Sequence, residues 1–349
     1  MNRLIKFSLL TADILKGRIF NKNIPLVIGL HVTNMCNFNC VYCYGLYYDN
    51  EKEDFTTAEV LKLIDELSDM GTRYITLTGG EPLLRDDIEV IIDRIKEKNI
   101  ICSMNTNGSL IGKKINIVKK LDSVTVSLDG AEKATNDKNR GENTFVKIME
   151  GIRLLKSNKI PFDSVTVVTK NNFRSLKKIL ELAKKEAFMA EFNLVQDQNS
   201  EINDAIKHQL PIKEAKEVLR QLVQFKKEGY PVLYANSSRE YALNWPFDYS
   251  RKILYGEIPK NFEYPPCYMG KFMCHIDADG YVYPCIQLAG RFPALNFKEV
   301  GFKRAWEHLE KSKKCKTCYA ICYNEFNQLY GLKIDVWWNN MRNLILQKI

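Results

Sequence analysis

The stretch LVIGLHVTNMCNFNCVYCY, residues 26–44, joins two patterns that together decide the fold. Its first seven residues are mostly apolar or β-branched, which is typical of a buried strand. Directly after them, Cys36, Cys40 and Cys43 lie within eight positions. In parallel α/β folds, functional residues gather in the loops that leave the carboxyl ends of the strands. The stretch therefore predicts a strand whose carboxyl end carries a site built from three thiols.

Outward from this stretch, short β-branched runs alternate with amphipathic segments as far as about residue 195. The expected strands are residues 26–32, 74–78, 100–104, 123–128, 164–168 and 191–195. The expected helices are residues 56–70, 86–98, 111–120, 143–157 and 173–186, with Thr56 and Asp86 as N-caps and Gly71 as a C-cap. Strands that alternate with helices imply parallel βαβ units, and hence a barrel or an open doubly wound sheet.

The overall composition is that of a soluble globular protein, with 349 residues of which 45% are hydrophobic and 27% are charged. No segment approaches the ~18 uninterrupted apolar residues of a membrane span, and the N-terminus lacks a signal-peptide pattern. The net charge of +9 is spread along the chain, so we expect a Lys-rich surface and no nucleic-acid partner. These features predict a cytoplasmic protein.

The chain is expected to divide into five segments. They are an N-terminal amphipathic helix (1–24), a core barrel (25–200), a substrate-facing linker (201–265), a cysteine-rich domain (266–330) and a C-terminal helix (331–349). The two end segments either cap the barrel, which is the favoured interpretation, or make a peripheral membrane contact. The cysteine-rich domain is poor in periodic apolar sequence, so we expect it to need a metal in order to fold.

Nine of the ten cysteines fall within residues 36–43 and 267–322, and such clustering is typical of metal or iron–sulfur ligation. Zinc is one interpretation of the first cluster, although a structural zinc site needs a fourth ligand nearby and only His31 precedes the triplet. A cubane iron–sulfur cluster held by three thiolates instead leaves one iron open to a small molecule.

The C-x3-C-x2-C spacing, with Tyr42 before the last cysteine, resembles the signature of the radical S-adenosylmethionine (radical SAM) enzymes. The resemblance implies a partial (β/α)6 TIM-like barrel in which Cys36, Cys40 and Cys43 hold a 4Fe–4S cluster and the open iron chelates S-adenosylmethionine. It also implies a flavodoxin- or ferredoxin-type electron donor. Reductive cleavage of the cofactor then gives a 5′-deoxyadenosyl radical that abstracts hydrogen from a substrate.

The loops after the next three expected strands fit the same resemblance, because TGGEP at residues 78–82 matches the GGEP motif of the family. The cofactor-binding residues implied in this way are Tyr42, Gly79, Gly80, Glu81, Pro82, Asn105, Asn107, Ser127, Asp129 and Arg140. The GGEP backbone and its carboxylate would contact the cofactor's ammonium, and Arg140 would contact its carboxylate. Taken singly, the polar residues after GGEP are more often caps and turns.

The C-terminal cysteines are similar to the opening of the SPASM/twitch extension of that family, because Cys267 is followed by twelve residues, Gly280, four residues and Cys285. A DADG turn between them predicts a hairpin. The similarity implies one auxiliary 4Fe–4S cluster, or two. For a single cluster, the implied ligands are Cys267, Cys285 and two of Cys315, Cys318 and Cys322. A zinc ribbon is the alternative. Cys274 is interpreted as a strand residue, a ligand or a catalytic thiol.

The resemblance predicts an oxidoreductase that acts on a peptide, a protein or a small molecule, with the auxiliary cluster accepting the electron left on the substrate radical. A lipid or isoprenoid substrate is one alternative. The other is a zinc-stabilised binding protein without radical chemistry.

Overall fold

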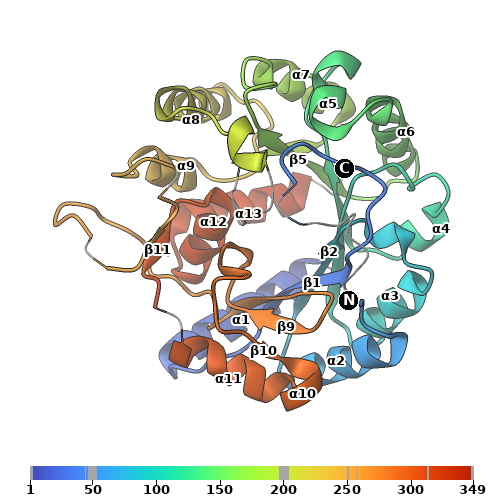
Figure 1. Ribbon diagram of the computed structural model, residues 1–349, viewed down its shortest axis with the longest axis vertical. Coiled ribbons are helices and arrows are strands. Elements are labelled where there is room, and N and C mark those ends of the chain that lie inside the picture. The colour runs from blue at the N-terminus through green and yellow to red at the C-terminus, as the bar shows by residue number, and fades with distance from the viewer. Residues whose placement is uncertain are drawn as a thin grey trace.

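Strand β1 (Val27–Thr33) is buried at every position, as its apolar sequence predicts. In the computed structural model it lies inside a sheet of order β10-β9-β8-β1-β2-β3-β4-β5-β6 (Figure 1). The structure describes residues 3–43, 45, 53–195, 204–249, 251–256, 258–312 and 314–346. The ends of the expected terminal helices, residues 1–2 and 347–349, lie outside the described residues.

Six parallel strands form the barrel. They are β1, β2 (Tyr74–Gly79), β3 (Ile101–Thr106), β4 (Ser123–Ser127), β5 (Phe162–Val168) and β6 (Met189–Leu194), each paired with the next. Beyond β6 the chain at Val232 forms only an isolated parallel bridge to Ala190. The barrel is therefore partial, and the predicted (β/α)6 architecture is confirmed.

Helices cover the outside of these strands (Figure 1). They are α2 (Thr57–Asp69), α3 (Ile88–Glu97), α4 (Ile115–Val118), α5 (Lys133–Arg140), α6 (Thr144–Ser157) and α7 (Leu176–Glu186). Thr56 caps α2 in a capping box with Glu59, as predicted. The other two predicted caps are each displaced by one residue, because α3 begins after Asp87 and α2 ends at Met70. Helix α5 was not predicted because its sequence, KATNDKNR, has no apolar periodicity.

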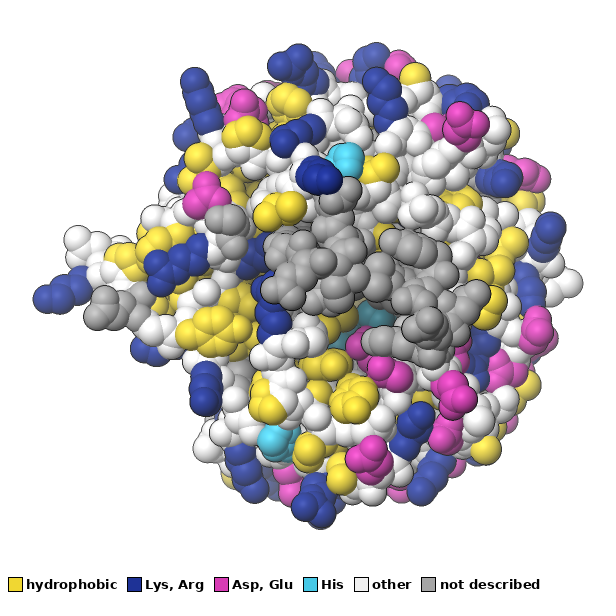
Figure 2. Space-filling view, viewed as in Figure 1, with side chains coloured by type: hydrophobic (Ala, Val, Ile, Leu, Met, Phe, Trp, Pro, Cys, Tyr) yellow, Lys and Arg dark blue, Asp and Glu magenta, His cyan; other side chains and the backbone are white. Residues whose placement is uncertain are grey.

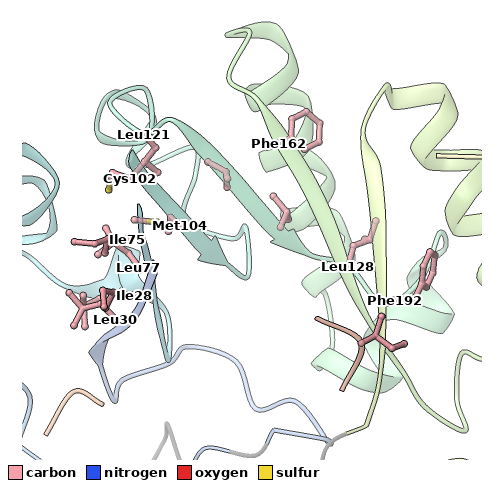
Figure 3. Packing of buried hydrophobic residues seen from close by; sticks show 14 of the residues in the cluster. Ile28, Leu30, Ile75, Leu77, Cys102, Met104, Leu121, Leu128, Phe162 and Phe192 are labelled. Atoms are coloured by element: carbon pink, nitrogen blue, oxygen red, sulfur yellow. The ribbon is translucent and has the colours of Figure 1, made fainter. Parts of the chain in front are cut away.

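The pleat of the strands separates an apolar outer face from a polar inner face. Outward-pointing residues pack against the helices in the main core, and Figure 3 labels ten of them, including Cys102 as an ordinary buried strand residue. Inward-pointing residues line the lumen, and the polar ones are Thr76, Thr78, Ser103, Asn105, Thr125, Ser127, Asp163, Glu191 and Asn193. Apolar residues such as Val165 and Val167 share this wall, so the barrel encloses an open space lined by both kinds of side chain.

The cysteine-rich segment extends the barrel sheet rather than standing apart from it. Strand β8 (Met273–Ile276) pairs in parallel with β1, and β9 (Tyr281–Tyr283) returns antiparallel to β8 through the predicted turn. Strand β10 (Leu295–Asn296) completes this edge. Apolar residues of this segment share one cluster with α1 (Arg3–Ile19) and the start of β1. Apolar packing against the barrel therefore helps to hold it.

The remaining elements follow β6 in the chain, apart from η1, which lies between β2 and α3. The helices are α8 (Ile212–Lys227), α9 (Asn236–Leu243), α10 (Phe297–Val300), α11 (Phe302–Ser312), α12 (Ile321–Tyr330) and α13 (Ile334–Leu346). The short elements are β7 (Ile253–Leu254), β11 (Thr317–Cys318), η1 (Pro82–Leu84), η2 (Asp204–His208) and η3 (Ile286–Leu288). Within the described ranges, no helix is long and apolar enough to cross a membrane.

Candidate active site

The three N-terminal cysteines lie in the loop after β1 and line a cavity of about 480 Å³ that continues into the barrel lumen. Figure 2 shows Lys and Arg side chains spread around the rim of the molecule in this view, with Asp and Glu among them. Helix α5 and the loop after β3 hold the cysteine loop in place. The backbone N–H of Val41 donates to the Asn139 carbonyl oxygen at 3.0 Å, and the side chain of Asn107 bonds to the Cys36 thiol.

Burial raises the pKa of all three thiols, to about 11 for Cys40 and about 12 for Cys43, and neighbouring thiols add to the effect at Cys40 and Cys43. Three adjacent thiolates therefore need positive charge beside them, of which the Arg140 guanidinium supplies a part. This donor set fits an iron–sulfur cluster, whose irons supply the rest. In the described part of the chain, no group of three His, Cys, Asp or Glu side chains has the arrangement that holds a single metal ion.

Gly79 and Gly80 bring the end of β2 against the cysteine loop. A β-carbon on Gly80 would lie 2.0 Å from the Met35 carbonyl oxygen, and one on Gly79 would lie 2.4 Å from that of Thr33. The backbone N–H of Gly80 donates to the Thr33 carbonyl oxygen at 2.9 Å. Only glycine permits this approach, and both glycines expose their backbone to the cavity.

Glu81 and Pro82 do not line the cavity, and their contacts with the cofactor stay a prediction. Glu81 is fully buried, and its carboxylate accepts hydrogen bonds from the backbone N–H groups of Asn107 (2.7 Å) and Leu83 (3.1 Å) and from the Thr106 hydroxyl (2.8 Å). Burial raises its pKa despite these bonds. The carboxylate thus fastens η1 to the end of β3.

Tyr42, Asp129 and Arg140 meet in a buried network. The Tyr42 hydroxyl donates to Asp129 Oδ2 at 2.5 Å, and Arg140 Nη1 donates to Tyr42 Oη at 2.5 Å and to Asp129 Oδ2 at 3.1 Å. Asp129 Oδ1 accepts from the backbone N–H of Val167 at 2.9 Å. Tyr42 and Arg140 line the cavity but Asp129 does not, so Asp129 positions the other two. Arg140 Nε is buried without a partner and retains the capacity to donate.

The other predicted polar residues, Asn105, Asn107 and Ser127, all line the cavity. Asn107 also braces the loops, because its Nδ2 donates to Asn37 Oδ1 at 2.8 Å. Asn105 is the exposed residue of β3 and points into the open space. The structure thus brings eight of the ten predicted cofactor residues to one cavity or directly behind its wall, with Gly79, Gly80, Tyr42 and Arg140 at its mouth.

Glu191 and Asp163 are two lumen carboxylates that the sequence analysis did not single out. Among the described residues of the cavity wall, Arg140 is the only Lys or Arg. Glu191 is 7% exposed, is hydrogen-bonded by the Asn193 amide and the Tyr234 hydroxyl, and has a pKa that burial raises. Asn193 Oδ1 is buried without a partner. The wall around β6 therefore presents acceptor atoms, and the alternation of polar and apolar residues in the strands was the signal that could have revealed it.

His275 was also missed. It faces Gly29 across the β8–β1 pairing, and its ring reaches the cavity over that glycine. Nε2 lies 3.0 Å from Tyr323 Oη, which accepts from the backbone N–H of Ile286 at 3.1 Å. Burial, with His31 nearby, lowers the pKa of His275 to about 3, so the imidazole is neutral at physiological pH. Its Nδ1 is buried without a partner.

Four C-terminal cysteines lie together behind the cavity wall. Burial, followed by the nearby thiols of Cys318, Cys267 and Cys315, raises the pKa of Cys285. Cys267, Cys322 and Cys315 act in the same way on Cys318. Their mutual influence places four thiols close enough to surround one cluster.

The last two cysteines differ from these four. Cys322, in the first turn of α12, lies near Cys318 and lines the same cavity as the N-terminal triplet. Cys274 is fully buried on β8 within the main core, where burial alone raises its pKa, and it does not line the cavity. Of its three interpretations, the structure supports the strand residue.

Comparisons with known proteins agree with this geometry. Residues 30–183 match the family model described as the radical SAM superfamily. The AdoMet-dependent heme synthase of Methanosarcina barkeri is 30% identical over 317 residues, which cover 84% of this chain and 85% of the relative. The AdoMet-dependent heme synthase of Nitratidesulfovibrio vulgaris is 28% identical over 307 residues, which cover 83% of this chain and 81% of the relative.

Solved structures share the fold. Streptococcus suis SuiB bound to S-adenosylmethionine has a TM-score of 0.63 at 16% identity, covering 82% of this chain and 66% of that chain. The enzyme anSMEcpe with bound AdoMet has a TM-score of 0.65 at 19% identity, covering 93% of this chain and 98% of that chain. At these identities the likeness concerns the arrangement of the backbone.

Proposed function

Because the chain belongs to the radical SAM superfamily, we propose that Cys36, Cys40 and Cys43 hold its 4Fe–4S cluster and that the cavity mouth holds S-adenosylmethionine beside it. When bound, these cofactors supply a 5′-deoxyadenosyl radical that removes a hydrogen atom from the substrate. The residues of the chain bind, orient and shield the reacting groups. The observation that carries the proposal is the cavity itself, which joins the cysteine triplet to the lumen of the barrel.

The groups beside the cysteine loop suit the ammonium and the carboxylate of S-adenosylmethionine. Gly79 and Gly80 present backbone close to the cysteine loop without a side chain between them. Arg140 Nε offers a donor to a carboxylate, and the Asp129 carboxylate keeps the guanidinium in place. Tyr42 shares this network, and we propose that its ring packs against the adenine.

We assign the auxiliary 4Fe–4S cluster to Cys267, Cys285, Cys315 and Cys318. Cys318, Cys267 and Cys315 all act on the pKa of Cys285, whereas Cys322 acts on Cys318 and lines the cavity, which favours Cys315 as the fourth ligand. This assignment puts the auxiliary cluster just behind the cavity wall, where it can take an electron from a substrate radical. A flavodoxin- or ferredoxin-type protein is the proposed source of electrons for the first cluster.

The substrate that fits the lumen is neutral or cationic and rich in hydrogen-bond donors. Glu191, Asp163 and Asn193 offer hydrogen-bond acceptors. Apart from Arg140, the described residues of the wall include no Lys or Arg that could balance the charge of a polyanion. The same wall also carries apolar side chains, among them Val165, Val167 and Phe326, so the substrate can have an apolar part beside its donor groups. A peptide or a polar small molecule fits. Two proteins of this fold, SuiB and anSMEcpe, have been solved with bound peptides.

Oxidation of such a substrate requires loss of a hydrogen atom, an electron and, for an alcohol, amine or thiol group, a proton. Glu191 is the lumen carboxyl that Asn193 and Tyr234 hold in position. We propose that it binds the donor group of the substrate and accepts that proton. The electron passes to the auxiliary cluster, so charge and atoms balance.

The test is formation of 5′-deoxyadenosine by anaerobically reconstituted protein under dithionite. We expect product from the wild type, together with brown absorbance near ~400 nm from the clusters. Replacement of Cys36, Cys40 and Cys43 by Ala abolishes the product, whereas Cys102→Ala, a change in the outer core, retains it. Product from the triple variant would refute the assignment. A colourless wild type that binds only zinc would refute the cluster.

A further inference from the structure

Helix α1 carries apolar residues on two opposite faces. One face packs into the protein, where Leu10 and Ile14 are buried against the C-terminal elements. The opposite face is turned to solvent, and its apolar residues are Ile5 (52% exposed), Leu9 (38%), Leu15 (38%) and Ile19 (73%). A helix that packs through one face needs no second apolar stripe for its own stability. The stability of α1 therefore does not explain why its outer face carries exposed apolar residues.

Helix α13 adds a matching stripe beside it. Ile334 and Trp338, one turn apart, are 84% and 74% exposed. A groove of about 350 Å³ runs between the two helices, and its lining is Thr11, Leu332, Ile334, Trp337, Trp338 and Met341. The rings of Phe7 and Trp337 lie 5.2 Å apart and join the helices. We call the exposed residues Ile5, Leu9, Leu15, Ile19, Ile334 and Trp338 the terminal-helix patch.

The charges around this patch are mainly positive. Lys16 lies on the outer face of α1, and Arg342 lies one turn after Trp338 on α13. Both are exposed, as are Arg18 and Lys22 at the end of α1. Two acidic residues lie on these helices. Asp13 is paired with Arg73 at 2.7 Å, and Asp335 is exposed on α13.

We propose that the terminal-helix patch docks the protein on an anionic membrane surface. Apolar side chains, a solvent-exposed tryptophan and flanking cations are the combination that a headgroup layer with negative lipids attracts. A second copy of the chain fits less well, because its patch would bring the same positive charges into contact. The proposal rests on surface residues alone and is independent of the proposed reaction.

Flotation of the reconstituted protein with vesicles tests the proposal. With equimolar phosphatidylglycerol and phosphatidylcholine we expect the protein to float with the vesicles at low salt, and to be released as salt screens the charges. With phosphatidylcholine alone we expect it to stay in solution. Absence of flotation with the anionic vesicles, or equal flotation with both, would overturn the proposal.

Variants distinguish vesicle binding through the terminal-helix patch from non-specific adsorption. Trp338→Ser with Ile334→Ser should lower partitioning roughly tenfold or more, because two large apolar contacts are lost. Lys16→Glu and Arg342→Glu should each lower it at least about fivefold. Val90→Ser and Val146→Ser are the matched controls, since these exposed valines lie on α3 and α6, and they should bind as the wild type does. Equal loss in the controls, or a dimer in gel filtration that Trp338→Ser dissolves without any vesicle binding, would refute the membrane assignment.

Discussion

Gly29 lies directly opposite His275 in the β1–β8 pairing, and the imidazole occupies the space that a side chain at residue 29 would need. A β-carbon on Gly29 would lie 2.4 Å from Cε1 of His275. Gly29→Ala should therefore lower the free energy of unfolding by about 1–3 kcal/mol through overpacking. Urea unfolding measures this loss. Gly256→Ala, where nothing lies within 4 Å, should leave stability close to that of the wild type.

The same pair predicts non-additivity. If the imidazole is the obstacle, Gly29→Ala combined with His275→Ala should be more stable than the sum of the single changes implies. Additive losses would show that the strain at Gly29 comes from another neighbour.

The network of Tyr42, Asp129 and Arg140 should respond in a graded way. Asp129→Asn leaves a buried guanidinium without its anion and should cost about 3–5 kcal/mol, whereas Tyr42→Phe removes one hydroxyl and should cost about 1–2 kcal/mol. Glu132→Gln, which breaks the exposed pair with Lys178, should not change stability measurably. Chemical denaturation measures the free energy of unfolding of all three variants. A loss in Glu132→Gln as large as that in Asp129→Asn would contradict the ranking.

Glu81 distinguishes a structural role from a direct contact with the cofactor. At present the Glu81 carboxylate accepts hydrogen bonds from the Thr106 hydroxyl and the Asn107 backbone N–H. Glu81→Gln places an amide N–H₂, itself a donor, against one of these donors and should destabilise the fold by about 1–3 kcal/mol. Thermal unfolding and calorimetric titration with S-adenosylmethionine check this together. Unchanged stability with weakened cofactor binding would instead restore the expected ammonium contact.

The barrel and the cysteine triplet could be predicted because both are local in sequence. Strand periodicity and the C-x3-C-x2-C spacing need no knowledge of distant contacts. The direction of the Glu81 side chain could not be predicted, since it depends on the N–H groups of Asn107 and Leu83 after folding. Likewise, no residue near Gly29 predicts that β8, more than two hundred residues later, pairs with β1. Helix α5 was missed because contacts of its polar residues, and not apolar periodicity, hold it in place.

Glu191 makes a prediction about pH. Burial raises the pKa of its carboxyl in the folded state, so the native protein binds this proton more tightly than the unfolded chain does. Stability should therefore fall as the pH rises above the ordinary carboxyl value of 4.5, and the cost stays in place above the folded pKa. Glu191→Gln removes that cost, so its advantage in free energy of unfolding over the wild type should grow with pH. Unfolding of both proteins at several pH values measures it, and a difference that does not change with pH would contradict it.

The same variant should separate stability from catalysis. If Glu191 accepts the substrate proton, Glu191→Gln should retain 5′-deoxyadenosine formation in the absence of substrate and lose substrate oxidation. Wild-type turnover by Glu191→Gln would assign the proton to another group.

The C-terminal cysteines predict different iron contents for two single changes. Cys315 belongs to the four thiols assigned to the auxiliary cluster, so Cys315→Ala should lower iron from roughly eight to roughly four atoms per chain. Cys322 faces the cavity on α12, so Cys322→Ala should keep its iron and change substrate turnover instead. Iron analysis and Mössbauer or electron paramagnetic resonance spectra of both variants, reconstituted side by side, decide between the sets. Loss of iron in Cys322→Ala with full iron in Cys315→Ala would exchange their assignments, and would place a ligand of the auxiliary cluster in the cavity wall beside the substrate.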